Sequence, residues 1–161
     1  MTSFKNMLIA LIILVICLFC GSYLSANIPA IKELNPNLSN EYVQELDNAF
    51  SKASSEYGID KNLLISMAFL ESSFESGVKG DGDKSWGIMQ VGKQGRKRCG
   101  YIDTVEGQIM SGACWLNEGV IWCGDIEGAL KAYACGQCET TNYRCTQAVK
   151  RRLKLAKEIS K

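Results

Sequence analysis

The strongest constraint on this fold is a nearly unbroken apolar run, Leu63–Leu70, which ends at a carboxylate, Glu71. Asp60 is placed as an N-cap, and the sequence predicts a helix over Lys61–Phe74. A helix that is apolar nearly all round is usually buried in the centre of a domain. The other elements of the domain are therefore expected to pack around this helix.

Glu71 shares a face of this helix with apolar side chains. It follows Leu64, Met67 and Ala68 by seven, four and three positions, so its carboxyl is predicted to point into the core or into a cleft cut in the core. A buried charge is costly unless it is paired or neutralised. Desolvation favours the neutral carboxyl, so we expect the pKa of Glu71 to be raised.

Size, charge and the absence of histidine narrow the possible functions. The chain has 161 residues, which suits one domain with a hydrophobic core, and its net charge of +1 gives no reason to expect a nucleic acid partner. It contains no histidine, which excludes Ser-His-Asp and Cys-His nucleophiles and His-ligated catalytic zinc. Carboxylates are therefore the leading acid and base candidates, and we expect neither a metal nor another cofactor.

The N-terminal residues, 1–26, resemble an export signal. One cation, Lys5, precedes an apolar core, Met7–Cys20, whose length is typical of a signal peptide. If the apolar segment is taken as 7–24, it is just long enough for an uncleaved anchor in the inner membrane. Both alternatives predict that the rest of the chain is exported to the periplasm.

Six cysteines follow this segment: Cys99, Cys114, Cys123, Cys135, Cys138 and Cys145. An even set of cysteines in a small exported domain predicts a disulfide framework, although the sequence does not choose the pairing. The alternative is a metal site, because Cys135 and Cys138 have ligand-like spacing. Disulfides are favoured, since the chain lacks histidine and is expected outside the cytosol.

The start of the folded domain is marked by prolines and then by helical periodicity. Residues 27–39 contain both prolines and are predicted to be a linker before a domain at 40–161. Apolar residues with 3-4-3-4 spacing, closed by Gly58, predict an amphipathic helix: Val43, Leu46, Phe50, Ala53 and Tyr57.

Two stretches after the central helix are predicted to be loops. Residues 75–91 are rich in Gly, Asp and Ser, which favour turns. The basic run at 93–98 is predicted to be a solvated loop, with contact to an anionic polymer as the alternative.

Capping residues predict two helices beyond these loops. Asp103 with Glu106 resembles a capping box, and Gly119 is placed to close the helix that follows. Asp125 is placed to cap a short helix that ends at Gly136.

A last helix is predicted near Asn142–Ser160. Its apolar residues are expected to face inward: Ala148, Val149, Leu153, Ala156 and Ile159. Its basic residues are expected to lie mostly outside: Lys150, Arg151, Arg152, Lys154 and Lys157. No strong alternating strand pattern appears, so the predicted class is mainly α.

Three segments stand out together: Glu71–Phe74 with ESSF, 86–90 with WGIMQ and 129–136 with ALKAYACG. Their order and separation resemble the soluble lytic transglycosylase family over about Leu38–Ile159. The resemblance implies a lysozyme-like helical domain of the goose type, here stabilised by disulfides. The small size, the signal and the cysteines are most similar to the specialised periplasmic transglycosylases of type III and type IV secretion, conjugation and pilus systems.

The resemblance also implies a role for each matching residue. Glu71 is the expected catalytic acid, and Ser72 would hydrogen-bond near it or to the acetamido group of the sugar. Met89 and Gln90 would line the cleft, and Tyr133 would reach towards Glu71 or the sugar.

Two positions depart from the family pattern. Ala134 stands where the family has an asparagine that helps to hold the glycan, which puts one sugar contact in doubt. Gln108 replaces a second asparagine, a milder change. Neither departure removes the acid.

The implied reaction is cleavage of the β-1,4 bond between N-acetylmuramic acid and N-acetylglucosamine, with formation of 1,6-anhydromuramic ends. Glycosidases that hydrolyse need a second carboxylate, and the sequence shows no convincing partner, because Asp81 and Asp83 lie in a glycine-rich loop. The family instead uses the substrate's own N-acetyl group. Such an enzyme would open peptidoglycan locally for a secretion, conjugation or pilus machine.

Two alternatives stay open at the level of sequence. The first is a hydrolytic phage or virion lysozyme of the same fold. The second is a non-catalytic protein that binds the wall as a scaffold, to which Ala134 gives some weight.

Overall fold

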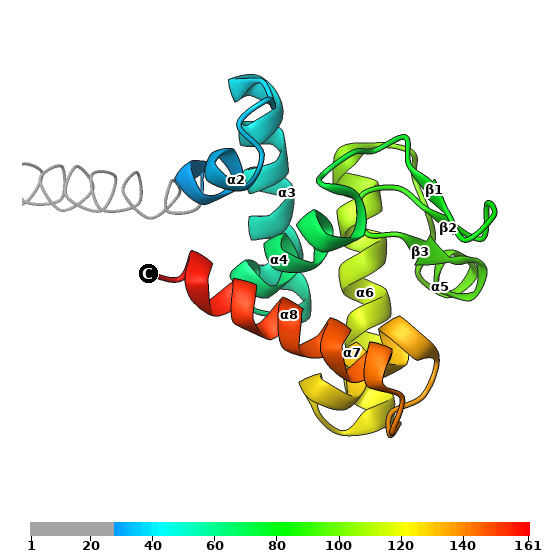
Figure 1. The fold of residues 1–161 in the computed structure, drawn as a ribbon. Helices are drawn as coiled ribbons and strands as arrows, with labels where there is room; N and C mark the ends of the chain where they lie inside the picture. The colour runs from blue at the N-terminus through cyan, green and yellow to red at the C-terminus, as the bar shows by residue number, and fades with distance from the viewer. Residues whose placement is uncertain (1–27) are drawn as a thin grey trace, which may run out of the picture.

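The computed structural model describes residues 28–161, which form seven helices and three short strands (Figure 1). The helices are α2 (Ile28–Leu34), α3 (Asn40–Tyr57), α4 (Lys61–Ser72), α5 (Lys93–Cys99), α6 (Val105–Cys123), α7 (Ile126–Cys135) and α8 (Tyr143–Ile159). The strands are β1 (Lys79–Gly80), β2 (Ser85–Trp86) and β3 (Val91–Gly92). The predicted mainly α class is confirmed.

The predicted signal peptide or anchor, at residues 1–26, lies outside the described residues. Between residues 28 and 161, no helix has both the length and the apolar character that a membrane span requires. The anchor at 7–24 therefore stays a prediction.

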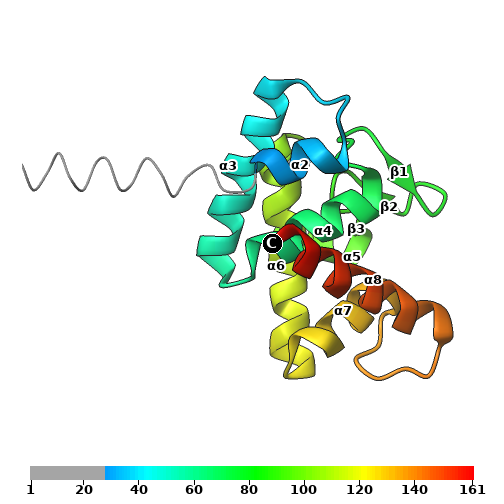
Figure 2. The ribbon, with the colours of Figure 1, turned by 60° about the vertical axis from the view of Figure 1, so that its left-hand side comes forward.

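The segment predicted to be a linker contains α2, which packs against α3 (Figure 2). Ile31 of α2 is fully buried in the core. The two prolines do not oppose this helix, because Pro29 lies in its first turn and Pro36 follows its end. The residues described in this segment are therefore part of the fold.

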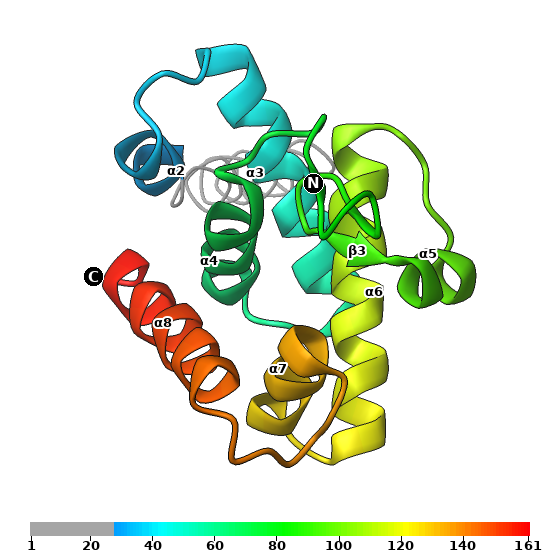
Figure 3. The same cartoon turned by 45° about the vertical axis from the view of Figure 1, so that its right-hand side comes forward.

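Helix α4 is the buried centre of the domain, as its composition predicts. Four of its apolar residues have no exposed surface: Leu64, Ile65, Met67 and Ala68. Asp60 caps its start by accepting a hydrogen bond from Leu63 N at 2.9 Å. Helix α3 packs against α4, and so does α8, which lies along it in Figure 3.

The central helix ends at Ser72 rather than at the predicted Phe74. Ser73 and Phe74 adopt left-handed backbone conformations, with φ of 54° and 70°. The chain therefore turns sharply, and the Phe74 ring enters the core, where it lies edge-on to Phe50 with ring centroids 6.3 Å apart.

The stretch 75–91, predicted to be loop, contains most of a small antiparallel sheet over residues 79–92, in the order β1-β2-β3. Each strand has two residues, and the register pairs Lys79 with Trp86 and Ser85 with Gly92. Strands this short leave no alternating pattern in the sequence, which explains why the prediction missed them. The sheet projects from one side of the helical body (Figure 1).

The basic run predicted to be a loop is helix α5. Gly95 permits close packing, because a Cβ there would lie 2.6 Å from Val91 Cγ1 and 3.0 Å from Trp115 Cγ. The Arg96 guanidinium lies 4.4 Å from the centroid of the Trp86 ring, in cation–π contact. Arg96 of this basic run therefore contributes to tertiary packing.

Helix α6 begins and ends later than predicted. Thr104, not Asp103, is its N-cap and accepts a hydrogen bond from Gly107 N at 3.0 Å. Its C-cap is Gly124, and Gly119 lies inside the helix, where a Cβ would be 3.2 Å from Ala129 Cβ. The glycine at 119 thus serves the close packing of α7 on α6 rather than a helix end.

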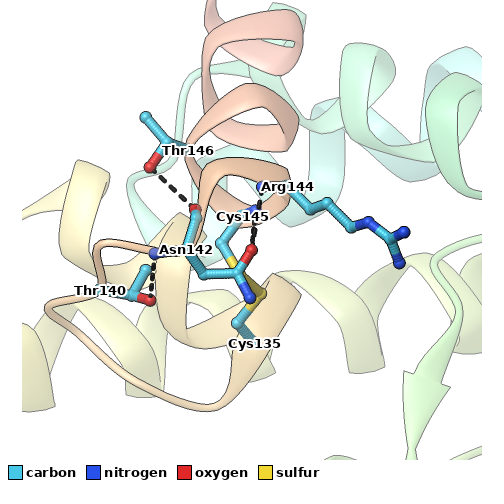
Figure 4. Close-up of a disulfide and its surroundings, with 6 residues drawn as sticks. All are labelled: Cys135, Thr140, Asn142, Arg144, Cys145 and Thr146. Carbon is cyan, nitrogen blue, oxygen red and sulfur yellow. Dashed lines mark hydrogen bonds between the residues drawn. A yellow bond between two sulfur atoms is a disulfide. The ribbon is translucent and has the colours of Figure 1, made fainter.

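Residues 28–161 contain three disulfides: Cys99–Cys114, Cys123–Cys138 and Cys135–Cys145. The predicted framework is confirmed, and the closely spaced Cys135 and Cys138 bond to different partners. Figure 4 shows Cys135–Cys145 beside Asn142, whose side chain caps α8 by accepting from Arg144 N at 2.9 Å. Within residues 28–161, no cluster of three or more Cys, Asp or Glu is arranged to hold a metal ion.

Candidate active site

A groove runs past the end of α4. One hollow of about 450 Å³ is lined by side chains from α4, the strand region, α7 and α8, including Glu71, Asp81, Gln90, Tyr133 and Arg152. A second hollow of about 590 Å³ shares Asp81, Gln90 and Tyr133 with the first and continues to Trp115. Because the two hollows share walls, they form one elongated groove.

Glu71 lies at the last turn of α4 and faces this groove, and its side chain is 18% exposed. The residues predicted to share its face, Leu64, Met67 and Ala68, are fully buried. Glu71 is therefore at the boundary between the core and the groove, where a carboxyl is partly desolvated and still accessible.

An arginine of α8 pairs with this carboxyl. Arg152 Nη2 donates to Glu71 Oε1 in an ion pair, and the Arg152 side chain is 8% exposed. The prediction that Arg152 lies on the outward-facing side of this helix was wrong. The signal was present in the sequence, because Arg152 continues the spacing of Cys145 and Val149, the other two buried residues of α8.

Burial raises the pKa of the Glu71 carboxyl above its ordinary value. The positive charge of Arg152 and its hydrogen bond lower this pKa, and the negative charge of Asp81 raises it. The net direction is upward, which confirms the predicted shift although the carboxyl is paired rather than alone. The proton is thus retained to higher pH than on an exposed glutamate.

A second carboxylate, Asp81, lines both hollows. Its position in a glycine-rich segment did not predict a place near Glu71, and in the structure it lies in a turn with a φ of 52°. Ser85 Oγ lies 3.4 Å from Asp81 Oδ2. The fold therefore brings two carboxylates of different environment to one groove.

Tyr133 of α7 spans the groove. Its hydroxyl donates to Met89 O at 2.6 Å, and its ring lines both hollows. Burial raises the pKa of the Tyr133 hydroxyl, and the charge of Glu71 adds to that shift. Tyr133 is thus a neutral hydrogen-bonding group close to Glu71.

Met89 and Gln90 have different positions although they are adjacent in sequence. The Met89 side chain is fully buried against Gly112, where a Cβ would overlap it, so the side chain is not placed to line the groove. Gln90, with a φ of 47°, lines both hollows. Gln90 Nε2 donates to Gly87 O at 2.8 Å, and Oε1 accepts from Ser85 Oγ at 3.0 Å.

The Ser72 side chain binds the turn at 87–90 rather than Glu71. Its hydroxyl donates to Ile88 O at 2.9 Å. Gln108, which the sequence marked only as a departure, holds the same turn, since its Oε1 accepts from Ile88 N at 2.8 Å. Both contacts fix the backbone that carries Gln90.

Ala134 lines both hollows and contributes a methyl group where the family pattern has an amide. A methyl side chain has no donor or acceptor and can make no hydrogen bond to a sugar. The wall formed by α7 is therefore less polar at this point than the resemblance implies.

One of three comparisons with known proteins found a match. A family model described as Transglycosylase SLT domain matches residues 48–155. The matched span contains Glu71, the strand region, Tyr133 and Arg152. No curated protein and no solved structure matched the chain.

Proposed function

The chain belongs to the transglycosylase SLT domain family, and on that premise we propose that it cleaves peptidoglycan by lytic transglycosylation, with Glu71 as its acid and base. The bond cleaved is the β-1,4 bond between N-acetylmuramic acid and N-acetylglucosamine. The single observation that carries the proposal is the position of Glu71, a largely buried carboxyl of raised pKa at the wall of an elongated groove.

In the first step, Glu71 gives its proton to the glycosidic oxygen. The bond from C1 to that oxygen breaks, and the bonding electrons leave with the oxygen. Positive charge develops at C1, and the carbonyl oxygen of the N-acetyl group stabilises it from the same sugar. A carboxyl that stays protonated because it is desolvated suits this step.

In the second step, the Glu71 carboxylate takes the proton of the sugar's 6-hydroxyl. The oxygen of that hydroxyl attacks C1 and closes the 1,6-anhydro ring. Glu71 is protonated again, and no water is consumed. One carboxyl thus serves as acid and then as base.

The walls of the groove would hold the glycan strand. Gln90 and Tyr133 present polar groups near Glu71, and Trp115 presents a ring further along. Sugar rings pack well on aromatic faces through their C–H groups. Ala134 removes one polar contact, so we expect the strand to be held more by the opposite wall.

The decisive test compares Glu71→Gln with wild type on purified peptidoglycan. The amide has the size of the acid but has no proton to give at neutral pH, so we expect activity to fall below a few per cent. The matched control is Glu75→Gln, an exposed glutamate just beyond the end of the same helix, which should retain full activity. A Glu71→Gln variant that is folded and still active would contradict the proposal.

Asp81 supports a second candidate, a hydrolytic lysozyme, because hydrolysis uses two carboxylates across the scissile bond. Mass spectrometry of the digested wall separates the two reactions. Anhydromuramic ends, unchanged in Asp81→Asn, indicate transglycosylation. Reducing ends that disappear in Asp81→Asn indicate hydrolysis.

We further propose that the domain works in the periplasm beside a secretion, conjugation or pilus machine. The support is the apolar N-terminal sequence, the small size and the three disulfides. The residual alternative, a wall-binding scaffold without activity, predicts that wild type and Glu71→Gln bind the wall equally and that neither cleaves it.

A further inference from the structure

Arg152 is buried beside the acid and makes an ion pair with it. We infer that Arg152 is a positioning residue for Glu71: it orients the carboxyl and provides the positive charge that stabilises the carboxylate between the two proton transfers. The inference rests on the proposed role of Glu71 and adds a partner that the sequence pattern did not indicate.

The backbone around Arg152 is fixed by contacts of α8 with neighbouring elements. Ser66 of α4 donates its hydroxyl to Arg152 O at 2.7 Å, and both residues are buried. Earlier in α8, Val149 is buried and Cys145 is bonded to Cys135. The backbone of Arg152 is therefore held by the packing of α8 on α4, independently of Glu71.

The ion pair is not explained by stability alone. Arg152 Nε and Nη1 are buried and have no hydrogen-bond partner among the described residues. A buried arginine with unsatisfied donors carries a desolvation penalty, and well-packed apolar residues of similar volume are often at least as stable. A role in orienting and charging Glu71 accounts for an arginine at this position.

The hydrogen bond assigns different tasks to the two oxygens of Glu71. Oε1 accepts from Arg152 Nη2, and an arginine has no acceptor to offer a proton on that oxygen. The transferable proton is therefore carried by Oε2. After the first transfer, the carboxylate forms beside a fixed positive charge, which stabilises it without rearrangement of the site.

Other titratable groups also face this carboxyl. Asp81 acts from the strand side and Tyr133 from α7, and Arg144 of α8 lines the same hollow. Only Arg152 makes an ion pair with Glu71 among the described residues. The protonation of Glu71 is therefore expected to respond most strongly to changes at position 152.

The test is the dependence of kcat/KM on pH in Arg152→Met, with Arg151→Met as the matched control. Arg151 is the exposed neighbour on the same helix, so its variant should match wild type. In Arg152→Met we expect kcat/KM to fall about 10- to 100-fold, because the carboxyl loses its orientation. The alkaline limb should move up by about one pH unit or more, because a positive charge that lowered the pKa of Glu71 is gone.

The pH profile distinguishes a positioning role for Arg152 from a structural one. Loss of rate without movement of the alkaline limb would show a merely structural role, and a wild-type profile in Arg152→Met would overturn the inference outright. If methionine prevents folding, Arg152→Gln keeps a polar donor without the charge and should show the same upward shift. Failure of the proposed function is distinct, since wild type itself would then release no anhydromuramic ends.

Discussion

The two walls of the groove are stabilised in different ways. The wall formed by α7 and the start of α8 is covalently linked through Cys123–Cys138 and Cys135–Cys145. The facing wall, residues 79–92, contains no cysteine. Its shape depends on hydrogen bonds from its own side chains and from neighbouring helices.

The strand wall uses backbone conformations that need such support. Gly87 and Gln90 have positive φ values of 76° and 47°, and a left-handed conformation is unfavourable for glutamine. Ser72 and Gln108 bind both backbone groups of Ile88, between these two residues. The comparison shows that the disulfides fix the frame, whereas buried polar contacts set the conformation of the turn nearest Glu71.

The largest expected effect comes from removal of a disulfide, and the chain offers a matched pair. Cys123–Cys138 and Cys99–Cys114 have the same sequence separation of 15. Replacing either pair by alanine should lower the free energy of unfolding by about 3 kcal/mol, because loops of equal length are released. Thermal or urea unfolding measures the loss.

Activity then distinguishes the two disulfides. Only the Cys123–Cys138 variant should also lose wall cleavage well below its melting temperature, because that bond holds the α7 wall. Equal loss of activity in both variants would mean that the disulfides serve stability alone.

The next effect in size tests the strand wall. Gln108→Ala should cost about 1 to 3 kcal/mol, because it leaves the buried Ile88 N–H without a partner. Gln44→Ala, on the exposed face of α3, is the control and should change stability little. Urea unfolding of both variants gives the comparison, and equal stabilities would show that water replaces the lost contact.

A smaller effect is expected where the two walls meet. Tyr133→Phe removes the hydrogen bond from the Tyr133 hydroxyl to Met89 O. We expect a loss of about 1 kcal/mol and weaker glycan binding, seen as a higher KM with kcat less affected. A change confined to kcat would instead place the hydroxyl in the reaction itself.

The smallest effect is a change with pH. The raised pKa of Glu71 means that the folded state binds this proton more tightly than the unfolded state. That contribution is fully present below the ordinary value of 4.5 and is lost as pH rises through the folded value. Because the loss is absent in Glu71→Gln, the stability advantage of wild type over the variant should narrow from pH 4 to pH 8.

The ion pair with Arg152 changes the stability expected for Glu71→Gln at every pH. From the sequence, an unpaired Glu71 predicts a glutamine variant at least as stable as wild type at neutral pH. With Arg152 left buried and without its counter-charge, we expect the variant to be less stable throughout. An advantage of wild type that widens with pH would contradict the raised pKa.

The sequence by itself determined the features that depend on near neighbours along the chain. Asp60 and Asp125 cap the helices they were predicted to cap, and the last helix begins next to Asn142, close to its predicted start. The face of α4 that carries Glu71 is buried as predicted. These features follow from helical periodicity and from hydrogen bonds over three residues, which any fold of this chain must satisfy.

Only the tertiary structure decided which distant groups meet. Arg152 lies 81 residues from Glu71, Asp81 reaches the groove from a turn, and six cysteines allow many pairings of similar local chemistry. Helical periodicity could place Arg152 on an inward face, but it could not name the carboxylate opposite. Such pairs form because packing of α8 on α4 excludes water there, and that packing is a property of the whole chain.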